Sequence, residues 1–272
     1  MKRIERGMNG AERRSRAKRV WHFTRFALQP RGGYIVQLST GERIRTNAAI
    51  IATGRAGGNL GLPYVREYLD NNIAVAARLS SPGTELEPRT IIEAVPGGWF
   101  YLAAVPGNEI IVVFVTLATL VPSDRRVRLR WWLQALARTI AVRKALNRCH
   151  LPQNLWVVNA RASFARAAAG ERWLAIGDAR IAPDPLSGQG ILWAFDDAIS
   201  VMHLLRRMEW RDLAREMRAR TLRDVDAYRV ERSAVYSSEQ RFKEDVYWMG
   251  SGPALAVAPL RKNSAASPQQ PC

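Results

Sequence analysis

The chain has 272 residues, of which 47% are hydrophobic and 8% aromatic, so it can bury a substantial core. That composition excludes wholesale disorder, a collagen-like repeat and a small disulfide-linked module. The 41 Lys and Arg residues outnumber the 24 Asp and Glu residues and give a formal net charge of +17, almost all of it from arginine. Because arginine bias can reflect codon usage, we do not expect a nucleic-acid partner from the charge alone. The length predicts one large domain or two closely joined ones.

Cysteine and histidine are too sparse for a disulfide framework or a metal centre. The two cysteines are Cys149 and Cys272, and the three histidines, His22, His150 and His203, lie far apart in the sequence. No N-terminal apolar segment resembles a secretory signal, and no stretch reaches the roughly 18 apolar residues of a membrane span. We therefore expect a cytoplasmic protein without a metal and without a membrane partner.

The two ends of the chain differ from the rest in composition. Residues 1–31 hold ten Lys and Arg against two Glu, which we interpret as a solvated helix or terminus. The alternative is a polybasic arm that binds nucleic acid or a membrane. Residues 251–272 are rich in Pro, Ser, Ala and Gln, and we predict that they are disordered.

The first predicted elements are extended. Residues 20–28 and 34–38 alternate apolar and polar side chains and are followed by a turn at 40–42, which predicts a hairpin. Residues 48–52 predict a short buried strand that runs into the glycine-rich turn 53–58. A buried strand that ends in such a turn is typical of a nucleotide-binding sheet.

An antiparallel meander is predicted next, from four strand-like segments separated by Pro/Gly turns: residues 73–79, 89–95, 98–105 and 109–117. A helix is then predicted from Asp124 to Leu146. Its apolar residues share one face and are Leu129, Trp132, Leu133, Leu136 and Ile140.

The last third alternates strands and helices. Residues 155–158 and 172–176 are predicted strands, a helix follows Gly190, and one or two further helices cover residues 211–249. The helix after Gly190 carries a single apolar stripe formed by Ile191, Leu192, Phe195, Ile199 and Met202.

The chemistry concentrates in residues 173–198. Asp178 directly follows a buried strand, so its carboxylate should project at the carboxyl edge of the sheet and accept hydrogen bonds from sugar or ribityl hydroxyls. Two prolines stiffen the loop that follows, while Gly188 and Gly190 let a ligand approach the backbone closely. The N–H groups at the start of the next helix offer partial positive charge to an anionic or electron-rich ligand atom.

This segment resembles the second FAD-binding motif of the flavoprotein monooxygenase and halogenase superfamily, through Gly177-Asp178, the loop 185–190 and Asp197-Ala198. The resemblance implies that Asp178 binds a ribityl hydroxyl of FAD and that the loop approaches the isoalloxazine ring, where positive charge stabilises reduced flavin. Residues 49–55 resemble the strand of that family that precedes the adenine region. The cofactor-binding residues implied are Thr53, Gly54, Arg55, Gly177, Asp178, Pro185, Ser187, Gly188, Gln189 and Gly190.

Two aromatic segments refine the resemblance. Residues 97–106 are similar to a Trp-rich strand near the flavin, although aromatic residues on a strand can simply be core. Residues 236–242, with Tyr247 and Trp248 and together with residues 184–190, resemble a tryptophan-halogenase-like branch that includes maturases of quinoprotein amino-acid oxidases. The alternative is a helix whose aromatic residues pack on the sheet.

The implied fold is α/β: a partial FAD-binding, Rossmann-like domain of glutathione-reductase type, with an inserted antiparallel substrate sheet and C-terminal helices. We assign residues 1–68 and 150–210 to the FAD-binding part and 69–149 to the substrate part. Residues 211–250 form the C-terminal helical region, and 251–272 the tail.

The chain also departs from the family. The GxGxxG motif that binds the FAD pyrophosphate is absent, since Gly54, Gly57, Gly58 and Gly61 have the wrong spacing. No lysine matches the one that halogenases use. Arg180 replaces a small residue, and we expect it to face solvent rather than a phosphate. We therefore interpret the chain as truncated at its N-terminal end.

The resemblance implies an FAD-dependent oxidoreductase that oxygenates or halogenates an electron-rich aromatic compound or a protein-borne tryptophan. No catalytic acid or base can be assigned. A flavin reductase or a complementing N-terminal chain is the expected protein partner. The alternatives are a non-catalytic remnant or basic binding module, and one half of a split flavoprotein.

Overall fold

The computed structural model describes residues 23–28, 33–55, 62, 64–80, 89–147 and 149–251. Our predictions for the basic N-terminal segment, the turn glycines after position 55 and the tail from 252 lie outside these residues. Within them, the predicted α/β class is confirmed: helices accompany one five-stranded and three three-stranded sheets.

The five-stranded sheet is antiparallel throughout, in the order β10-β6-β9-β8-β7. Its strands are β6 (Asn72–Ser80), β7 (Thr90–Val95), β8 (Gly98–Val105), β9 (Glu109–Leu117) and β10 (Trp156–Asn159). The predicted meander is confirmed for β7, β8 and β9. The strand predicted at 155–158 forms as β10 and joins this sheet through β6, although we assigned it to the FAD-binding part.

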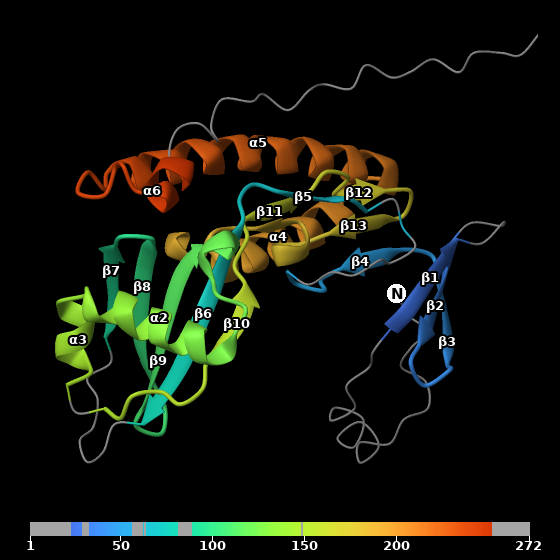
Figure 1. Ribbon diagram of the computed structural model, residues 1–272. Coiled ribbons are helices and arrows are strands. Elements are labelled where there is room, and N and C mark those ends of the chain that lie inside the picture. Colours follow the sequence, from blue (N-terminus) through green and yellow to red (C-terminus); the bar gives the residue numbers. More distant parts are fainter. Residues whose placement is uncertain are drawn as a thin grey trace, which may run out of the picture.

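One face of this sheet is covered by α2 (Arg125–Ala137) and α3 (Ala141–Ala145), which follow the short turn η1 (Ala118–Leu120) (Figure 1). Asp124 caps α2 as its side chain accepts hydrogen bonds from two backbone N–H groups of the first turn. The prediction of one helix to residue 146 is wrong. Glu93 on β7 accepts hydrogen bonds from the N–H groups of Ile140 (2.5 Å) and Val142 (2.9 Å), so a new helix begins there and Ile140 is 81% exposed.

The second half of the molecule contains three small sheets. A sheet in the order β1-β2-β3 forms the predicted hairpin, from β1 (Phe23–Leu28), β2 (Tyr34–Leu38) and β3 (Arg43–Thr46). A second sheet has the order β12-β13-β4, from β12 (Ala169–Gly170), β13 (Trp173–Ala175) and β4 (Ala49–Ile51). The third has the order β14-β11-β5, from β14 (Ile181–Ala182), β11 (Ser163–Ala165) and β5 (Arg66–Tyr68).

Strands β4 and β13 pair in parallel, which matches the two strands predicted to precede the glycine-rich turns. Their carboxyl ends therefore meet at one edge of the sheet. One face packs on the hairpin sheet, with Tyr34, Ile51 and Trp173 in a shared buried cluster.

The C-terminal helices are α4 (Gly190–Leu205), α5 (Trp210–Ser237) and α6 (Val246–Ser251), and the short turns η2 (Gly177–Ala179) and η3 (Pro185–Ser187) precede them. Figure 1 shows α5 running along the top of the molecule, above α4 and the small sheets. Aromatic residues of α5 and α6 pack on the second face of the five-stranded sheet, next to Trp99. No helix among the described residues has the length and apolar character needed to cross a membrane.

Candidate functional site

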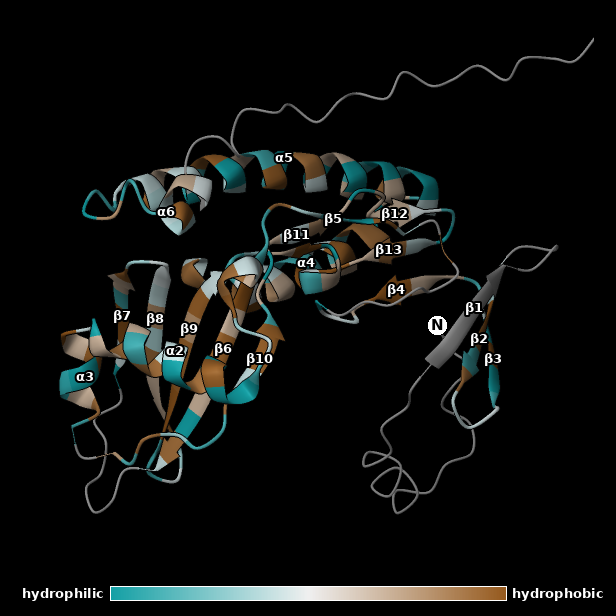
Figure 2. Cartoon of the chain, viewed as in Figure 1, coloured by the Kyte–Doolittle hydropathy of each residue, from teal (hydrophilic) through white to brown (hydrophobic). Residues whose placement is uncertain are grey.

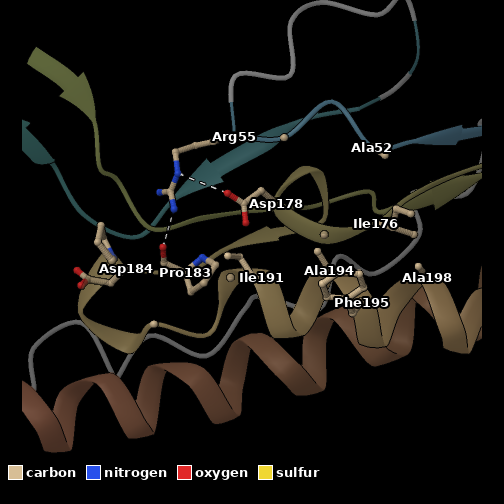
Figure 3. A pocket seen from close by; sticks show the side chains of 15 residues that line it. Ala52, Arg55, Ile176, Asp178, Pro183, Asp184, Ile191, Ala194, Phe195 and Ala198 are labelled. Atoms are coloured by element: carbon tan, nitrogen blue, oxygen red, sulfur yellow. Dashed lines mark hydrogen bonds and ion pairs between the residues drawn. The ribbon is translucent and has the colours of Figure 1, made fainter. Parts of the chain in front are cut away.

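The two glycine-rich turns that follow β4 and β13 line one pocket of about 730 Å³ (Figure 3). The start of α4 forms the opposite wall, because η2 and η3 lead the chain from β13 back across the sheet edge. The pocket is lined by Ala52, Gly54, Arg55, Ile176, Gly177, Asp178, Pro183, Asp184, Pro185, Gly188, Gly190, Ile191, Ala194, Phe195 and Ala198.

Asp178 places a carboxylate at the pocket wall. Gly177 before it has φ of +57°, and a Cβ there would lie 3.0 Å from the Cβ of Ala194, so the close turn needs glycine. The Asp178 side chain is 30% exposed, and among the described residues it forms one ion pair, of 3.7 Å, with the Nε of Arg55. Oxygen atoms of the carboxylate therefore stay free to accept hydrogen bonds from a ligand.

Arg55 holds the two turns together. Its guanidinium donates hydrogen bonds to the carbonyl oxygens of Arg161 (2.6 Å) and Pro183 (2.8 Å), and it faces Asp178 (Figure 3). One side chain thus links the turn after β4 to the loop before η3. This arrangement fixes the spacing between the two sides of the pocket.

The loop 185–190 presents backbone rather than side chains to the pocket. Gly188 has φ of +62°, and a Cβ built there would meet no atom within 4 Å. A Cβ at Gly190 would lie 3.4 Å from Asp178, in the space between the loop and the carboxylate. The side chain of Gln189 makes no capping hydrogen bond to α4, so the amide groups of the first turn carry the positive end of the helix dipole.

The sequence-predicted cofactor residues divide into three groups. Those that line the pocket together are Gly54, Arg55, Gly177, Asp178, Pro185, Gly188 and Gly190. Ser187 and Gln189 instead line a neighbouring cavity of about 190 Å³ on the other side of the loop. The Oγ1 of Thr53 is buried without a hydrogen-bond partner in the described structure and lines neither cavity.

Asp184, to which the sequence analysis assigned no role, holds the loop 185–190 in place through its hydrogen bonds. Its Oδ1 accepts a hydrogen bond from the N–H of Leu186 (2.8 Å), which caps η3. Its Oδ2 accepts from Asn72 Nδ2 (3.0 Å) and from the hydroxyl of Tyr236 (2.9 Å), and its N–H donates to the hydroxyl of Tyr228 (2.6 Å). The Asp-Pro pair before η3 is the one signal in the sequence that indicates this cap.

A buried charge cluster surrounds Asp184. Arg232 on α5 lies 3.6 Å from Asp184 and 3.1 Å from Asp70. Burial raises the pKa of Asp70 from 3.8 to about 6, although Arg232 opposes the shift. Burial and the charge of Asp184 also raise the pKa of Tyr236, which keeps its hydroxyl protonated and able to donate.

The cluster continues into the five-stranded sheet. Trp99 on β8 donates its indole N–H to the hydroxyls of Tyr247 (2.9 Å) and Tyr236 (3.2 Å). The aromatic residues of the 236–248 segment therefore pack on the sheet, as the alternative interpretation expected. They also connect the sheet, through Asp184, to the loop that lines the pocket.

The expectation that Arg180 faces solvent is wrong. Its side chain is 2% exposed and forms ion pairs of 2.7 Å with Asp197 on α4 and Asp224 on α5. Asp197 also accepts a hydrogen bond from the N–H of Gly177 at 2.8 Å, so this carboxylate stabilises the turn before Asp178. Two nearby acidic groups explain why the arginine is buried.

The residues of the pocket fit an FAD ring and ribityl chain. The pocket offers a partly exposed carboxylate, a backbone open at Gly188 and a helix N-terminus, and 730 Å³ lies within the range of small-molecule sites. Asp178 would hold the ribityl hydroxyls, and Gly188 and Gly190 would face the ring.

Comparison with known proteins agrees with this geometry. No protein-family model matches the chain. A curated protein named "Putative FAD-dependent oxidoreductase LodB", from Marinomonas mediterranea, is 25% identical over 201 residues, which are 72% of this chain and 54% of LodB.

Solved structures with a similar fold include two halogenases and a tryptophan dihydroxylase. The flavin-dependent halogenase CmlS superposes with a TM-score of 0.71 at 19% identity and covers 89% of this chain and 48% of its own. The myxobacterial chondrochloren halogenase CndH has a TM-score of 0.72 at 14% identity, and the match covers 86% of this chain and 57% of CndH. The peptidyl tryptophan dihydroxylase QhpG has a TM-score of 0.64 at 19% identity, and the match covers 85% of this chain and 53% of QhpG.

The chain therefore has the fold of the FAD-dependent monooxygenase and halogenase superfamily, which confirms the resemblance found in the sequence. The names of LodB and CndH describe FAD-dependent proteins. The chain spans about half the length of each relative, so what the relatives do as whole proteins applies to this chain only as a proposal.

Proposed function

We propose that this chain is the part of an FAD-dependent oxidoreductase that binds the ribityl chain and isoalloxazine ring. One observation carries the proposal: Asp178, Gly188 and Gly190 line the same pocket as the glycine turn at Gly54. The assignment of residues 1–68 and 150–210 to the FAD-binding part belongs to this proposal, with β10 excepted.

Each residue has a distinct role in the proposed site. Asp178 accepts hydrogen bonds from hydroxyl groups, and Arg55 orients that carboxylate from 3.7 Å. The N–H groups at the start of α4 stabilise negative charge on the ring. Bound FAD would supply the activation of oxygen, which no side chain can supply.

The proposed substrate is an electron-rich aromatic compound or a protein-borne tryptophan. Support comes from QhpG, whose name describes action on a peptidyl tryptophan. The five-stranded sheet would form the substrate side, because the Asp184 cluster joins it to the flavin loop. A flavin reductase would deliver electrons in the cytoplasm, the compartment that the few cysteines favour.

Riboflavin is the sharpest probe of this proposal, because it has the ring and ribityl chain but no pyrophosphate. We expect the purified chain to quench riboflavin fluorescence, and Asp178→Ala to weaken binding at least about tenfold, the loss of one charge-assisted hydrogen bond. The control is Asp196→Asn, which changes an acidic residue of α4 that is 61% exposed and outside the pocket. Unchanged binding by Asp178→Ala would contradict the proposal.

A basic binding module is the second candidate, and the net charge of +17 is the observation that favours it. Retention on DNA that weakens steeply with salt, together with no binding of riboflavin, would select it.

A further inference from the structure

A second cavity, of about 530 Å³, lies at the far end of β13 from the pocket. The turn between β12 and β13 forms one side of it, and the first turns of α5, which packs on β12, form the other (Figure 1). Arg172 directly precedes β13, whereas Asp178 follows it, so the strand separates this cavity from the proposed flavin site. We call it the β12–α5 cavity, and the function proposed above gives it no role.

Three guanidinium groups line the β12–α5 cavity. They belong to Arg172 on the turn and to Arg211 and Arg218 on α5, and all three residues are exposed. Within the ranges that the structure describes, none of the three forms an ion pair. Arg218 donates a hydrogen bond to the carbonyl oxygen of Ala169 (3.0 Å), which orients its guanidinium group. Because a guanidinium group binds phosphate oxygens through paired hydrogen bonds, three of them around one cavity favour a ligand that carries phosphate.

Arg172 has a backbone conformation that arginine rarely adopts. Its φ is +58°, in the left-handed region where glycine is favoured. Two contacts hold the turn there: the hydroxyl of Tyr34 donates to the carbonyl oxygen of Glu171, and the carbonyl oxygen of Arg172 accepts a hydrogen bond from the N–H of Ala49 at 2.8 Å. The Arg172 side chain therefore starts from a fixed backbone in a strongly hydrophilic turn (Figure 2), which lowers the entropy lost when it binds an anion.

The rest of the cavity wall suits a nucleoside. Trp210 contributes an indole ring whose Nε1 donates a hydrogen bond to the carbonyl oxygen of Gly170 (3.3 Å), so the ring is held against the turn. Such rings stack with nucleobases. The carboxylates of Glu171 and Glu209 also line the cavity and can accept hydrogen bonds from ribose hydroxyls. A phosphate ion alone would leave most of the 530 Å³ empty, a volume typical of sites for larger organic ligands.

We propose that the β12–α5 cavity binds a nucleoside monophosphate, with its phosphate among the three guanidinium groups and its base on Trp210. The charge balance selects this class, because three guanidinium groups against two carboxylates suit one phosphate better than a chain of them. The proposal goes beyond the proposed function and does not depend on it, since no residue lines both this cavity and the flavin pocket.

Isothermal titration calorimetry of the full chain at low salt tests the proposal, with AMP as the probe. We expect AMP to bind, and adenosine and inorganic phosphate each to bind at least about tenfold more weakly, because each lacks one of the two groups that the cavity would recognise. The affinity for AMP should fall as the salt concentration rises. Absence of AMP binding at millimolar concentration would overturn the proposal, and so would inorganic phosphate that binds as tightly as AMP.

Two variants locate the bound AMP. Arg172→Gly removes a guanidinium group, and glycine adopts a φ of +58° without strain, so the turn should keep its shape. This variant and Arg211→Ala should each weaken AMP binding at least about tenfold, the loss of one charge-assisted contact to phosphate. The matched control is Arg215→Ala on α5, because Arg215 is 69% exposed, pairs with Asp212 at 3.2 Å and does not line the cavity. Equal weakening in all three variants would reduce the binding to overall charge and overturn the proposal.

A comparison of the two ligands separates this cavity from the flavin pocket. Riboflavin should not displace AMP, and Arg172→Gly should bind riboflavin as the unaltered chain does. Hydrogen exchange should show that AMP protects the amides of residues 170–172 and of the first turns of α5. Displacement of AMP by riboflavin would place AMP in the flavin pocket and overturn the proposal. A chain that binds AMP but not riboflavin supports the β12–α5 cavity and removes the proposed flavin site, so the two failures are distinguishable.

Discussion

The five-stranded sheet and the sheet β12-β13-β4 are stabilised in different ways. The first is covered on both faces, and its large aromatic side chains, such as Phe100 and Trp132, are fully buried. The second leaves the stripe of α4 and the edge of β4 in solvent, and its interior contains the Arg180–Asp197 ion pair. Apolar burial completes the first region, while the second combines internal charge pairing with apolar side chains that are exposed in the described structure.

The largest difference should appear when the same residue type is truncated in both regions. Phe100→Ala removes a ring stacked on Phe114 at 4.5 Å and should lower the free energy of unfolding by about 4 kcal/mol. Phe195→Ala removes a ring that is 66% exposed and should cost less than about 0.5 kcal/mol. Urea unfolding of both variants measures the difference, and similar losses would show that the face of α4 is already covered.

The ion pair inside the open region provides the next test. Arg180→Met leaves the buried Asp197 with only its longer ion pair to Arg220 (3.7 Å) and should lower stability by about 3 kcal/mol. Thermal unfolding at constant pH measures the loss. Asp196→Asn breaks only an exposed pair with Arg220 and serves as the control with little expected change. A stable Arg180→Met variant would mean that packing, not charge, holds this region.

The junction between the two regions should respond to pH. The folded state holds the proton of Asp70 more tightly than the unfolded chain, because burial raises its pKa from 3.8 to about 6. The contribution of Asp70 to the free energy of unfolding should therefore fall by about 3 kcal/mol as the pH rises from about 4 to about 6.

Asp70→Asn is the variant that isolates this group. The difference between its stability and that of the unaltered chain should change across pH 4 to 6 and stay constant above pH 7, as measured by denaturant unfolding at each pH. A constant difference over the whole range would show that Asp70 titrates near its ordinary value.

The smallest effect concerns the hydroxyl that joins the flavin loop to the sheet. Tyr236→Phe removes the hydrogen bond to Asp184 but leaves Asn72 and Leu186 as donors to that carboxylate, so the cost should be about 1 kcal/mol. Tyr68→Phe on the exposed edge is the matched control. Both the free energy of unfolding and the affinity for riboflavin are measured. A loss of stability with no change in affinity would show that this hydrogen bond does not influence the pocket.

The parts of the site that could be predicted from the sequence are local. Asp178, Gly188 and Gly190 lie within one strand–loop–helix segment, where strand direction and glycine conformation are determined by near neighbours. Arg55 also reached the pocket as expected, because the strand before it pairs with the strand before Asp178.

The parts that could not be predicted depend on partners distant in the sequence. Arg180 is buried because Asp197 and Asp224 arrive on two later helices. The helix predicted to residue 146 is interrupted because Glu93, on a strand, caps a new one at Ile140. The periodicity of a segment shows which of its faces is apolar. It does not show which charged residue from a distant part of the chain will pack against that segment.

The parallel pairing of Ala49–Ile51 with Trp173–Ala175 has a consequence for biosynthesis. The whole five-stranded sheet, from Asn72 to Asn159, lies between these two segments in the chain. During translation that sheet can fold before β13 has been synthesised to pair with β4, because a contact of such long sequence separation forms late. The nascent chain therefore exposes a short hydrophobic strand for several seconds at ordinary rates of synthesis, a period in which a chaperone has a specific segment to protect.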